Sequence, residues 1–145
     1  MVSITAFGPE GTADGDNPGL ASRILDVATD QPWYSQWYLT PEFGGLRQGT
    51  GLLLDLGEIA TVADVNLALG SAPGTDVQVR VGDTPSLTLP IAATGQGVGG
   101  TVRLTAKPHV KGRYVLIWFT RLPTIGQGHY QVSVYNVAVD GTIQP

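Results

Sequence analysis

The chain has 145 residues, enough for one domain with a substantial core, and its 20 Gly, 10 Pro and 14% charged residues favour an all-β fold with tight turns. A net charge of −4 argues against nucleic-acid binding, and the absence of cysteine excludes disulfides, thiolate nucleophiles and Cys-based metal sites. No apolar run approaches the ~20 residues of a membrane-spanning helix, so we expect no direct membrane insertion by this chain.

The first third of the chain shows one strand pattern and one helix start. Alternating residues at Ser3–Phe7 predict a strand, and the polar, Gly-rich stretch 8–16 predicts a loop. Asn17 is a good helix cap and the proline after it suits the first helical position, so we predict a short helix over Pro18–Leu25. The aromatic run 33–38 (W-Y-S-Q-W-Y) is predicted to be a strand or an aromatic loop.

The rest of the chain alternates between short apolar runs and turn residues. A long loop is expected over 40–49, and each apolar run after it predicts a strand. The predicted strands cover residues 51–56, 63–69, 77–81, 87–91, 102–105, 114–119 and 130–139. Such spacing without a long helical periodicity indicates a β-sandwich or jelly roll, and a different sandwich topology is the alternative.

Four sequence blocks, in this order, are similar to the discoidin-type (coagulation-factor C-type) domains. They are Asp26 with W-Y-S at 33–35, L-L-L-D-L-G at 52–57, V-A-D-V-N-L at 62–67, and R-Y-V-L-I at 113–117 with V-Y-N-V-A-V-D-G at 134–141. The resemblance covers nearly the whole chain. It implies that residues 1–145 form a single all-β domain, a discoidin-like (galactose-binding-like) jelly-roll β-sandwich of about eight strands with one short helix.

Two motifs narrow this resemblance. F-G-G-L at 43–46, before the strand at 52–57, and R-Y-V-L-I-W-F-T-R-L-P at 113–123 resemble the extracytoplasmic C-terminal domain of actinobacterial and mycobacterial MviN/MurJ-like peptidoglycan-precursor flippases. The resemblance implies a position on the cell-wall side, tethered to the plasma membrane through a parent protein whose other domains are its partners. The start of the chain lacks the features of a signal peptide, so we expect a piece excised from that membrane protein.

Catalytic chemistry finds little support in the sequence. His109 and His129 are the only histidines, each lies beside a turn signal, and there is no G-x-S-x-G nucleophile elbow. A glycosidase would need two facing acids, for which Asp55 and Asp64 are the strand-associated candidates. We instead expect Arg113 to pair with one of these acids and hold the sheet. We therefore predict that the chain is not an enzyme.

A calcium site is implied by many sugar-binding relatives of the discoidin type, whose ligands lie in a loop before the core tryptophan and on the last strand. In this chain Asp26 matches, but the second acid is Ala28, and Gln31 and Asn136 occupy two further ligand positions. Because Ca²⁺ needs six to eight oxygen ligands, we expect a degenerate site and no cofactor, with calcium as the alternative. The D-G-D-N stretch at 14–17 is another oxygen-rich loop, although such residues are also ordinary in turns.

Ligand binding is predicted at one end of the sandwich, where loops present aromatic and polar side chains. The candidate ligand-binding residues are Trp37, Tyr38, Phe43, Arg47, Arg121, Gln127 and His129. Arg121 and Arg47 together could clamp a carboxylate such as a muramyl lactyl group. Packing is the alternative role for the three aromatic candidates, and the other two tryptophans, Trp33 and Trp118, are assigned to the core.

Three functions follow, ranked in this order. The first is a non-catalytic extracytoplasmic binding module for carbohydrate, a cell-wall glycan or a peptidoglycan precursor, as the resemblance implies. The second is a protein-interaction or spacer domain with a decayed sugar site. The third is a membrane-surface binder, which needs exposed apolar loop tips flanked by basic residues. For that role only Leu39, Phe43 and Leu122 could serve, within an acidic domain.

Overall fold

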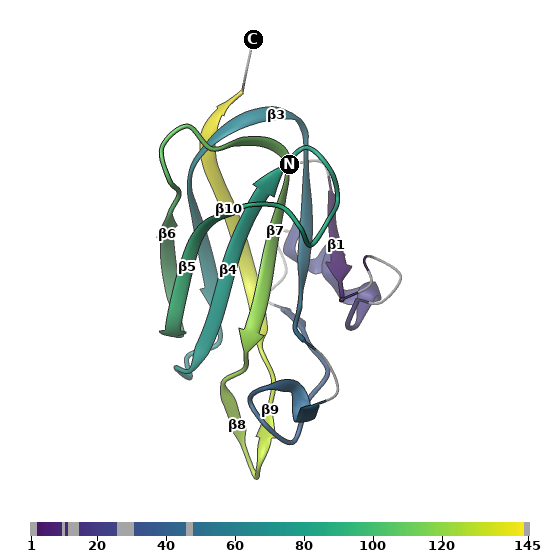
Figure 1. The fold of residues 1–145 in the computed structure, drawn as a ribbon. Coiled ribbons are helices and arrows are strands. Elements are labelled where there is room, and N and C mark those ends of the chain that lie inside the picture. Colours follow the sequence, from purple (N-terminus) through teal and green to yellow (C-terminus); the bar gives the residue numbers. More distant parts are fainter. Residues whose placement is uncertain (1–2, 10, 12–14, 26–30, 46–47, 144–145) are drawn as a thin grey trace.

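A computed structural model describes residues 3–9, 11, 15–25, 31–45 and 48–143, and these form the predicted discoidin-like β-sandwich (Figure 1). The strands are β1 (Ser3–Phe7), β2 (Trp33–Tyr34), β3 (Thr50–Leu69), β4 (Thr75–Gly82), β5 (Ile91–Val98), β6 (Thr101–Thr105), β7 (Lys111–Arg121), β8 (Thr124–Gly126), β9 (His129–Tyr130) and β10 (Ser133–Ile143). The described residues also contain two short 3-10 helices, η2 (Pro18–Leu25) and η3 (Phe43–Gly45).

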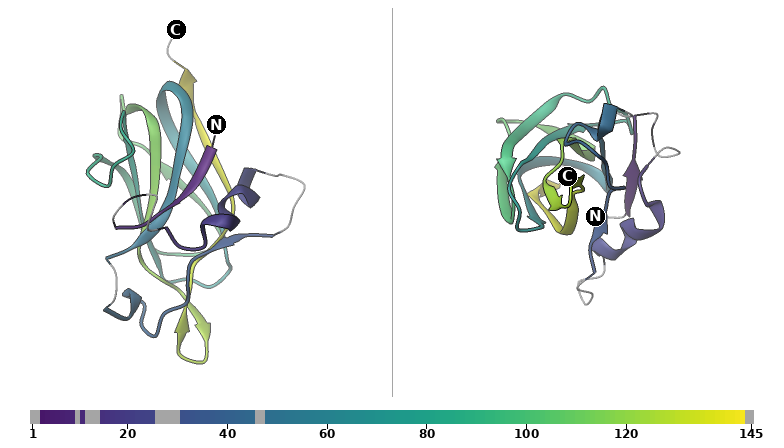
Figure 2. Two further views of the ribbon diagram at one scale, coloured as in Figure 1. Left: turned by 90° about the vertical axis from the view of Figure 1, so that its right-hand side faces the viewer. Right: turned by 90° about the horizontal axis from the view of Figure 1, so that it is seen from below.

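The long strand β3 belongs to both layers of the sandwich. Its first half pairs with β1 and β7, and its second half pairs with β6 and β10. Between the halves, Gly57 adopts a φ of 82°, and its N–H donates to Asp55 Oδ1 at 2.8 Å. This bend folds the sheet over, so that β1, β7, β4 and β5 form one layer and β6, β10 and β2 the other (Figure 2). The two strands predicted at 51–56 and 63–69 are therefore one strand.

The main core fills the space between the two layers. In β4 the residues alternate between buried and half-buried, as expected for a strand with one face inward. The largest fully buried side chains include Trp33, Phe43, Phe119, Leu52, Leu54, Leu67, Leu116, Ile117 and Leu122. Trp33 is 0% exposed, which confirms its predicted place in the core.

A second apolar cluster lies on the outer face of the β1–β3–β7 layer. It consists of Phe7, Leu53, Leu116 and Trp118, and Phe7 meets Trp118 edge-on with ring centroids 6.3 Å apart. Leu116 and Trp118 alternate along β7 with residues of the main core, so this strand is buried on both faces. That explains why its sequence is a continuous apolar run rather than an alternating one. It also confirms Trp118 as a packing residue.

Several element boundaries differ from the prediction. The strand predicted at 87–91 is wrong, because β5 begins at Ile91 and residues 83–90 form bends and turns in which Leu87 packs on the outer cluster. The β8–β9 hairpin occupies most of the segment between the predicted strands 114–119 and 130–139, and β10 begins at Ser133 rather than at residue 130. In the aromatic run 33–38 only the first two residues form a strand.

The two ends of the sandwich differ. The β8–β9 hairpin and η3 lie together at the lower end in Figure 1, and β10 finishes at the opposite end. The lower end is where the candidate ligand-binding residues were expected. In the part of the chain that the structure describes, no helix has the length and apolar character needed to cross a membrane.

Candidate ligand-binding site

The aromatic run 33–38 crosses from the sheet to the lower end of the sandwich. Its first two residues, β2, pair with Ser133 and Val134 of β10. Beyond β2 the run leaves the sheet, and Tyr38 exchanges two backbone hydrogen bonds with Tyr130 of β9, at 2.8 and 2.9 Å. Ser35, 0% exposed, accepts the Val132 N–H at its hydroxyl and is bonded to the same residue through its backbone. The run is therefore anchored to the last quarter of the chain.

Asp16 anchors the same run from the N-terminal side. This carboxylate is only 2% exposed, and its Oδ2 accepts hydrogen bonds from the Gln36 N–H at 3.1 Å and the Tyr38 hydroxyl at 2.9 Å. The Trp33 indole N–H donates to the Asp16 carbonyl at 2.9 Å. A buried carboxylate is stable only when such donors replace water. Asp16, from the oxygen-rich stretch predicted at 14–17, therefore holds the aromatic run in place, and Asp14 lies outside the described residues.

Asn17 adds two further contacts to the run. It has a φ of 45°, in the left-handed region that Asn tolerates better than most residues. Its carbonyl accepts the Leu20 N–H at 3.0 Å at the start of η2, so Asn17 begins the helix as predicted. The side chain does not cap that helix. It donates from Nδ2 to the Tyr34 carbonyl at 2.8 Å and accepts at Oδ1 from Gln36 Nε2 at 3.2 Å.

Trp37 is the exposed aromatic of the run. Its side chain is 53% exposed, and its ring stacks on His129 with centroids 4.2 Å apart and planes 26° from parallel. A cleft of about 520 Å³ is lined by Gln36, Trp37, Tyr38, Leu39 and Gly44. The structure thus brings together two predicted residues from distant parts of the chain, Trp37 and His129, at the edge of a cleft.

Two other predicted aromatic residues are buried beneath this surface. Tyr38 and Phe43 are 7% and 1% exposed and pack edge to face, with ring centroids 5.1 Å apart. Tyr38 still lines the cleft, but its hydroxyl is directed to Asp16. In this structure Phe43 presents no ring face to solvent, and neither does Leu122, which is 1% exposed. Phe43 and Leu122 therefore cannot act as the exposed apolar tips that a membrane-surface binder would need.

The predicted charged and polar residues lie around the same end. Arg121, at the end of β7, forms an exposed ion pair with Glu42, so a ligand carboxylate at Arg121 would compete with Glu42. Arg47, its predicted partner in a carboxylate clamp, lies outside the described residues. Gln127 is exposed in the turn of the β8–β9 hairpin, with a φ of 58°. No contact joins Gln127 to the cleft within the described ranges.

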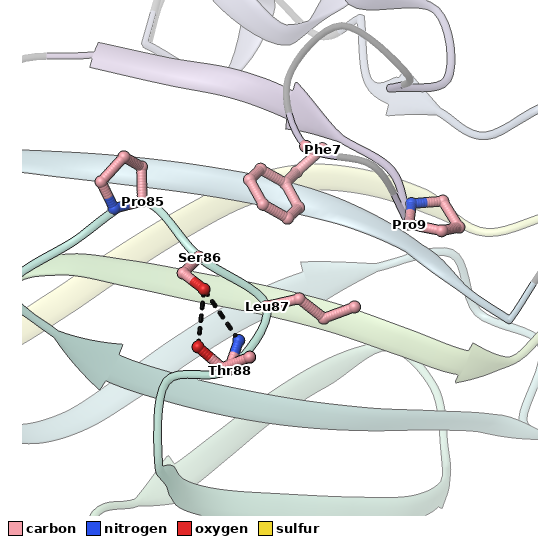
Figure 3. A pocket seen from close by; sticks show the side chains of 7 residues that line it. Phe7, Pro9, Pro85, Ser86, Leu87 and Thr88 are labelled. Carbon is pink, nitrogen blue, oxygen red and sulfur yellow. Dashed lines mark hydrogen bonds between the residues drawn. The ribbon is translucent and has the colours of Figure 1, made fainter.

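A second recess opens on the outer face of the sandwich (Figure 3). It measures about 410 Å³ and is lined by Phe7, Pro9, Gly11, Pro85, Ser86, Leu87 and Thr88. The hydroxyls of Ser86 and Thr88 bond to one another at 2.7 Å, as the dashed lines show. Phe7 itself is only 2% exposed and belongs to the outer cluster. The recess therefore offers little aromatic surface and few unengaged polar groups.

The predicted calcium ligands do not form a site in the described residues. Asp26 lies outside those residues, and Gln31 and Asn136 are both exposed. Within the ranges described, no three His, Asp or Glu side chains come close enough to hold a metal ion. Asp16, in the oxygen-rich stretch before η2, is buried and uses its carboxylate to hold the aromatic run.

The strand acids form structural ion pairs. Arg113 grips both carboxylate oxygens of Asp55 at 2.8 and 3.0 Å, which confirms the predicted pairing and lowers the pKa of Asp55. Asp64 is held by Arg103 at 2.7 Å, and this lowers the pKa of Asp64. Asp140 lies directly opposite Asp64 on β10, and a side-chain hydrogen bond with Asp64, together with the charge of Asp64, raises the pKa of Asp140. None of these acids lines the cleft beside Trp37.

Gln36 and Asn17 are the functional candidates that sequence reasoning missed. Gln36 lines the cleft beside Trp37, and Asn17 contacts it from a position 19 residues earlier. Only the position of Gln36 in the chain, between Ser35 and Trp37, could have pointed to it. In the sequence, Asn17 was explained by its position at the start of η2. No neighbouring residue in the sequence indicates its contacts with the aromatic run.

Comparison with known proteins identifies the fold. The chain matches the CBM32 module of AlyQ in complex with 4,5-unsaturated mannuronic acid (17% identity, TM-score 0.67, covering 97% of this chain and 95% of that one). It also matches chitosan-binding module 1 of a Paenibacillus sp. IK-5 chitosanase/glucanase, with 24% identity and a TM-score of 0.65, covering 96% of this chain and 94% of that one. A third match is the CpGH89CBM32-6 module of Clostridium perfringens, with 10% identity and a TM-score of 0.64, covering 97% of this chain and 95% of that one. No protein-family model and no curated protein matches the chain. At these identities the matches establish the discoidin-like β-sandwich.

Proposed function

We propose that this domain is a non-catalytic glycan-binding module in which a sugar ring stacks beside Trp37. The observation that carries the proposal is that Trp37 is 53% exposed and yet stacks on His129, on a run that hydrogen bonds anchor on both sides. An exposed aromatic with fixed orientation is preorganised for an apolar sugar face, since little conformational entropy is lost on binding.

The fold neighbours support this class of function. The modules from AlyQ, Paenibacillus and Clostridium are carbohydrate-binding or chitosan-binding modules by name. They share the fold over nearly the whole chain, and the cleft beside Trp37 has the concave, mostly apolar lining of a small-ligand site. The acids that a glycosidase would need are instead paired with arginines outside this cleft.

The finer assignment is a cell-wall ligand. We propose that the ligand is a glycan or precursor of peptidoglycan, and that the domain lies on the cell-wall side, carried by a membrane protein of cell-wall synthesis. The resemblance of the blocks at 43–46 and 113–123 to MviN/MurJ-like flippases supports this assignment. The exposed Leu39, 69% accessible at the cleft, also suits the acetamide methyl group of an N-acetylated hexosamine.

Protein interaction is the second candidate function. Ile125, on the same hairpin as His129, is 53% exposed, so Trp37, Leu39 and Ile125 place apolar surface at the same end of the molecule. A protein partner could cover these side chains without using the cleft for a sugar.

Calorimetric titration separates these functions. The ligands are tetra-N-acetylchitotetraose, its fully deacetylated counterpart and a soluble muropeptide, each tested on the wild type, Trp37→Ala and Tyr135→Ala. Tyr135 is the matched control, since it is an aromatic residue 46% exposed on β10 and outside the cleft. We expect saturable binding that Trp37→Ala weakens at least about tenfold and Tyr135→Ala leaves unchanged. Absence of binding by all three ligands would remove the glycan function and leave protein interaction as the leading account.

A further inference from the structure

The hydrogen bonds of Asn17 define which way its side-chain amide faces. The Tyr34 carbonyl can only accept, so the group of Asn17 that lies 2.8 Å from it must be the NH₂ group. The carbonyl oxygen of the Asn17 amide then faces the other way, toward Gln36. That oxygen can only accept, so it requires a donor from the Gln36 side chain, and Gln36 Nε2 lies 3.2 Å from it.

Gln36 is oriented in turn by this contact. Because its NH₂ group faces Asn17, its carbonyl oxygen is turned away from Asn17. No residue in the described part of the chain donates a hydrogen bond to that oxygen, and Gln36 is exposed and lines the cleft beside Trp37. The hydrogen bonds from Asn17 to Tyr34 and from Gln36 to Asn17 therefore leave the Gln36 carbonyl without a protein donor, facing solvent at the ligand site.

The other residues that line the cleft offer a ligand few hydrogen-bonding groups, so the Gln36 carbonyl is the main acceptor among the described lining side chains. The Tyr38 hydroxyl already donates to Asp16, Leu39 is apolar, and Gly44 has no side chain. Among the described residues, no charged side chain lines the cleft, and Arg121 near this end is paired with Glu42. A charged sugar would lose hydration without finding a counter-charge among the described lining residues.

We propose that Asn17 is a positioning residue that makes Gln36 a fixed hydrogen-bond acceptor, so that the cleft selects an uncharged sugar bearing a hydroxyl or amide N–H donor next to the ring at Trp37. The proposal rests on the glycan-binding function and names the ligand chemistry of that site. Gln36 contacts the ligand, and Asn17 acts only through Gln36.

The orientation of the amide is tested first, without any ligand. In ¹⁵N-labelled wild type we expect one of the two Gln36 side-chain N–H protons to be shifted downfield and to exchange slowly with water. Asn17→Ala should abolish both properties while leaving the backbone spectrum outside residues 15–20 and 33–39 unchanged. Identical Gln36 side-chain signals in wild type and Asn17→Ala would overturn the role of Asn17.

The ligand chemistry is tested with methyl β-N-acetylglucosaminide and its 3-, 4- and 6-deoxyfluoro analogues, because fluorine replaces a hydroxyl donor with a group that cannot donate. We expect one analogue to bind the wild type roughly five- to tenfold more weakly than the parent sugar. Gln36→Leu should bind the parent sugar more weakly and should no longer discriminate against that analogue. Asn17→Ala should show reduced discrimination, since its Gln36 amide is free to turn the NH₂ group toward the fluorine.

The controls separate this inference from the proposed function. Gln96→Leu changes an exposed glutamine on β5 that does not line the cleft, and it should keep the wild-type preference. If the parent sugar binds near Trp37 but Gln36→Leu retains the same discrimination, the inference is overturned and the glycan function stands. If no sugar binds at all, the ligand chemistry proposed here fails together with the glycan function.

Discussion

Asp16 shows how a single buried side chain supports a surface site. Its carboxylate, 2% exposed, accepts from the Gln36 backbone and the Tyr38 hydroxyl, and its carbonyl accepts from the Trp33 indole. These three residues flank or precede Trp37 in the same run. The position of the exposed tryptophan thus depends on a residue that lies 21 positions earlier and is itself inaccessible to a ligand.

Replacement of Asp16 by alanine should therefore destabilise the domain. The buried Tyr38 hydroxyl and the partly buried Gln36 N–H would lose their acceptor, which we expect to lower the free energy of unfolding by about 2–4 kcal/mol. Urea unfolding followed by tryptophan fluorescence measures this loss. Asp83→Ala, at an exposed aspartate in a bend, is the matched control and should change stability by less than about 0.5 kcal/mol. An Asp16→Ala variant as stable as the control would contradict the anchoring role.

Residue types alone predicted part of the site. Trp37 and His129 were predicted because exposed aromatic and loop residues are the usual means of binding sugars, and the structure brings the two into contact. Tyr38 and Phe43 were ligand candidates with packing as the alternative role, and the structure buries both. The sequence did not show which role each aromatic takes, because the strand ends after Tyr34. Once the run leaves the sheet, tertiary hydrogen bonds rather than a period of two decide which side chains face solvent.

At the level of elements, the bend of β3 is the feature that joins the two layers. The Gly57 N–H donates to Asp55 Oδ1, and the same carboxylate is gripped by Arg113 of β7. One side chain thus stabilises the bend and links β3 to its neighbour. Arg113 also lies 5.2 Å from the centre of the Tyr114 ring, which adds a cation–π contact.

The stability contributed by Asp55 should depend on pH in a definite direction. Its pKa in the folded state is lowered from 3.8, chiefly by the hydrogen bond from Arg113. The contribution is therefore complete above the unfolded-state pKa and is lost as the pH falls through the folded-state pKa. We expect Asp55→Asn to unfold at a lower temperature than wild type at neutral pH, by a few degrees, and the difference to shrink as the pH falls below 3.8.

Asp140→Asn should change the unfolding temperature in the opposite direction to Asp55→Asn. A side-chain hydrogen bond with Asp64 and the charge of Asp64 raise the pKa of Asp140, so ionised Asp140 is disfavoured in the fold at neutral pH. Removing its charge should leave the unfolding temperature equal or higher at neutral pH, as thermal unfolding monitored by circular dichroism would show. A gap between wild type and Asp55→Asn that stays constant from pH 7 to well below 3.8 would contradict the role assigned to the Asp55 carboxylate.

Element prediction succeeded where periodicity was strong and failed where one strand serves two layers. The run from Thr50 to Leu69 was predicted as two strands because Gly57 looked like a turn, whereas it bends a single strand. The segment 87–91 failed for another reason. Its alternating leucines suggested a strand, but Leu87 packs on the outer cluster and Leu89 is buried beside β4, where a Cβ on Gly82 would touch it.

At the scale of the whole molecule, the sandwich separates a packed body from one specialised end. The anchored aromatic run, η3 and the β8–β9 hairpin converge at the lower end of the fold as seen in Figure 1. The overall fold was predictable from composition, turn spacing and the discoidin-type blocks. The cleft was not, since its lining depends on hydrogen bonds between the loop at 15–17 and the run at 33–38.

The central claim is that the cleft beside Trp37 binds a sugar. Its most direct test is an NMR titration of the isotope-labelled domain with soluble peptidoglycan fragments, in which the backbone amide chemical shifts are recorded. The account predicts saturable shifts confined to residues 36–45 and to the β8–β9 hairpin that stacks His129 on Trp37. Unchanged spectra at millimolar ligand, or shifts centred on the outer recess around Phe7 and Leu87, would contradict it.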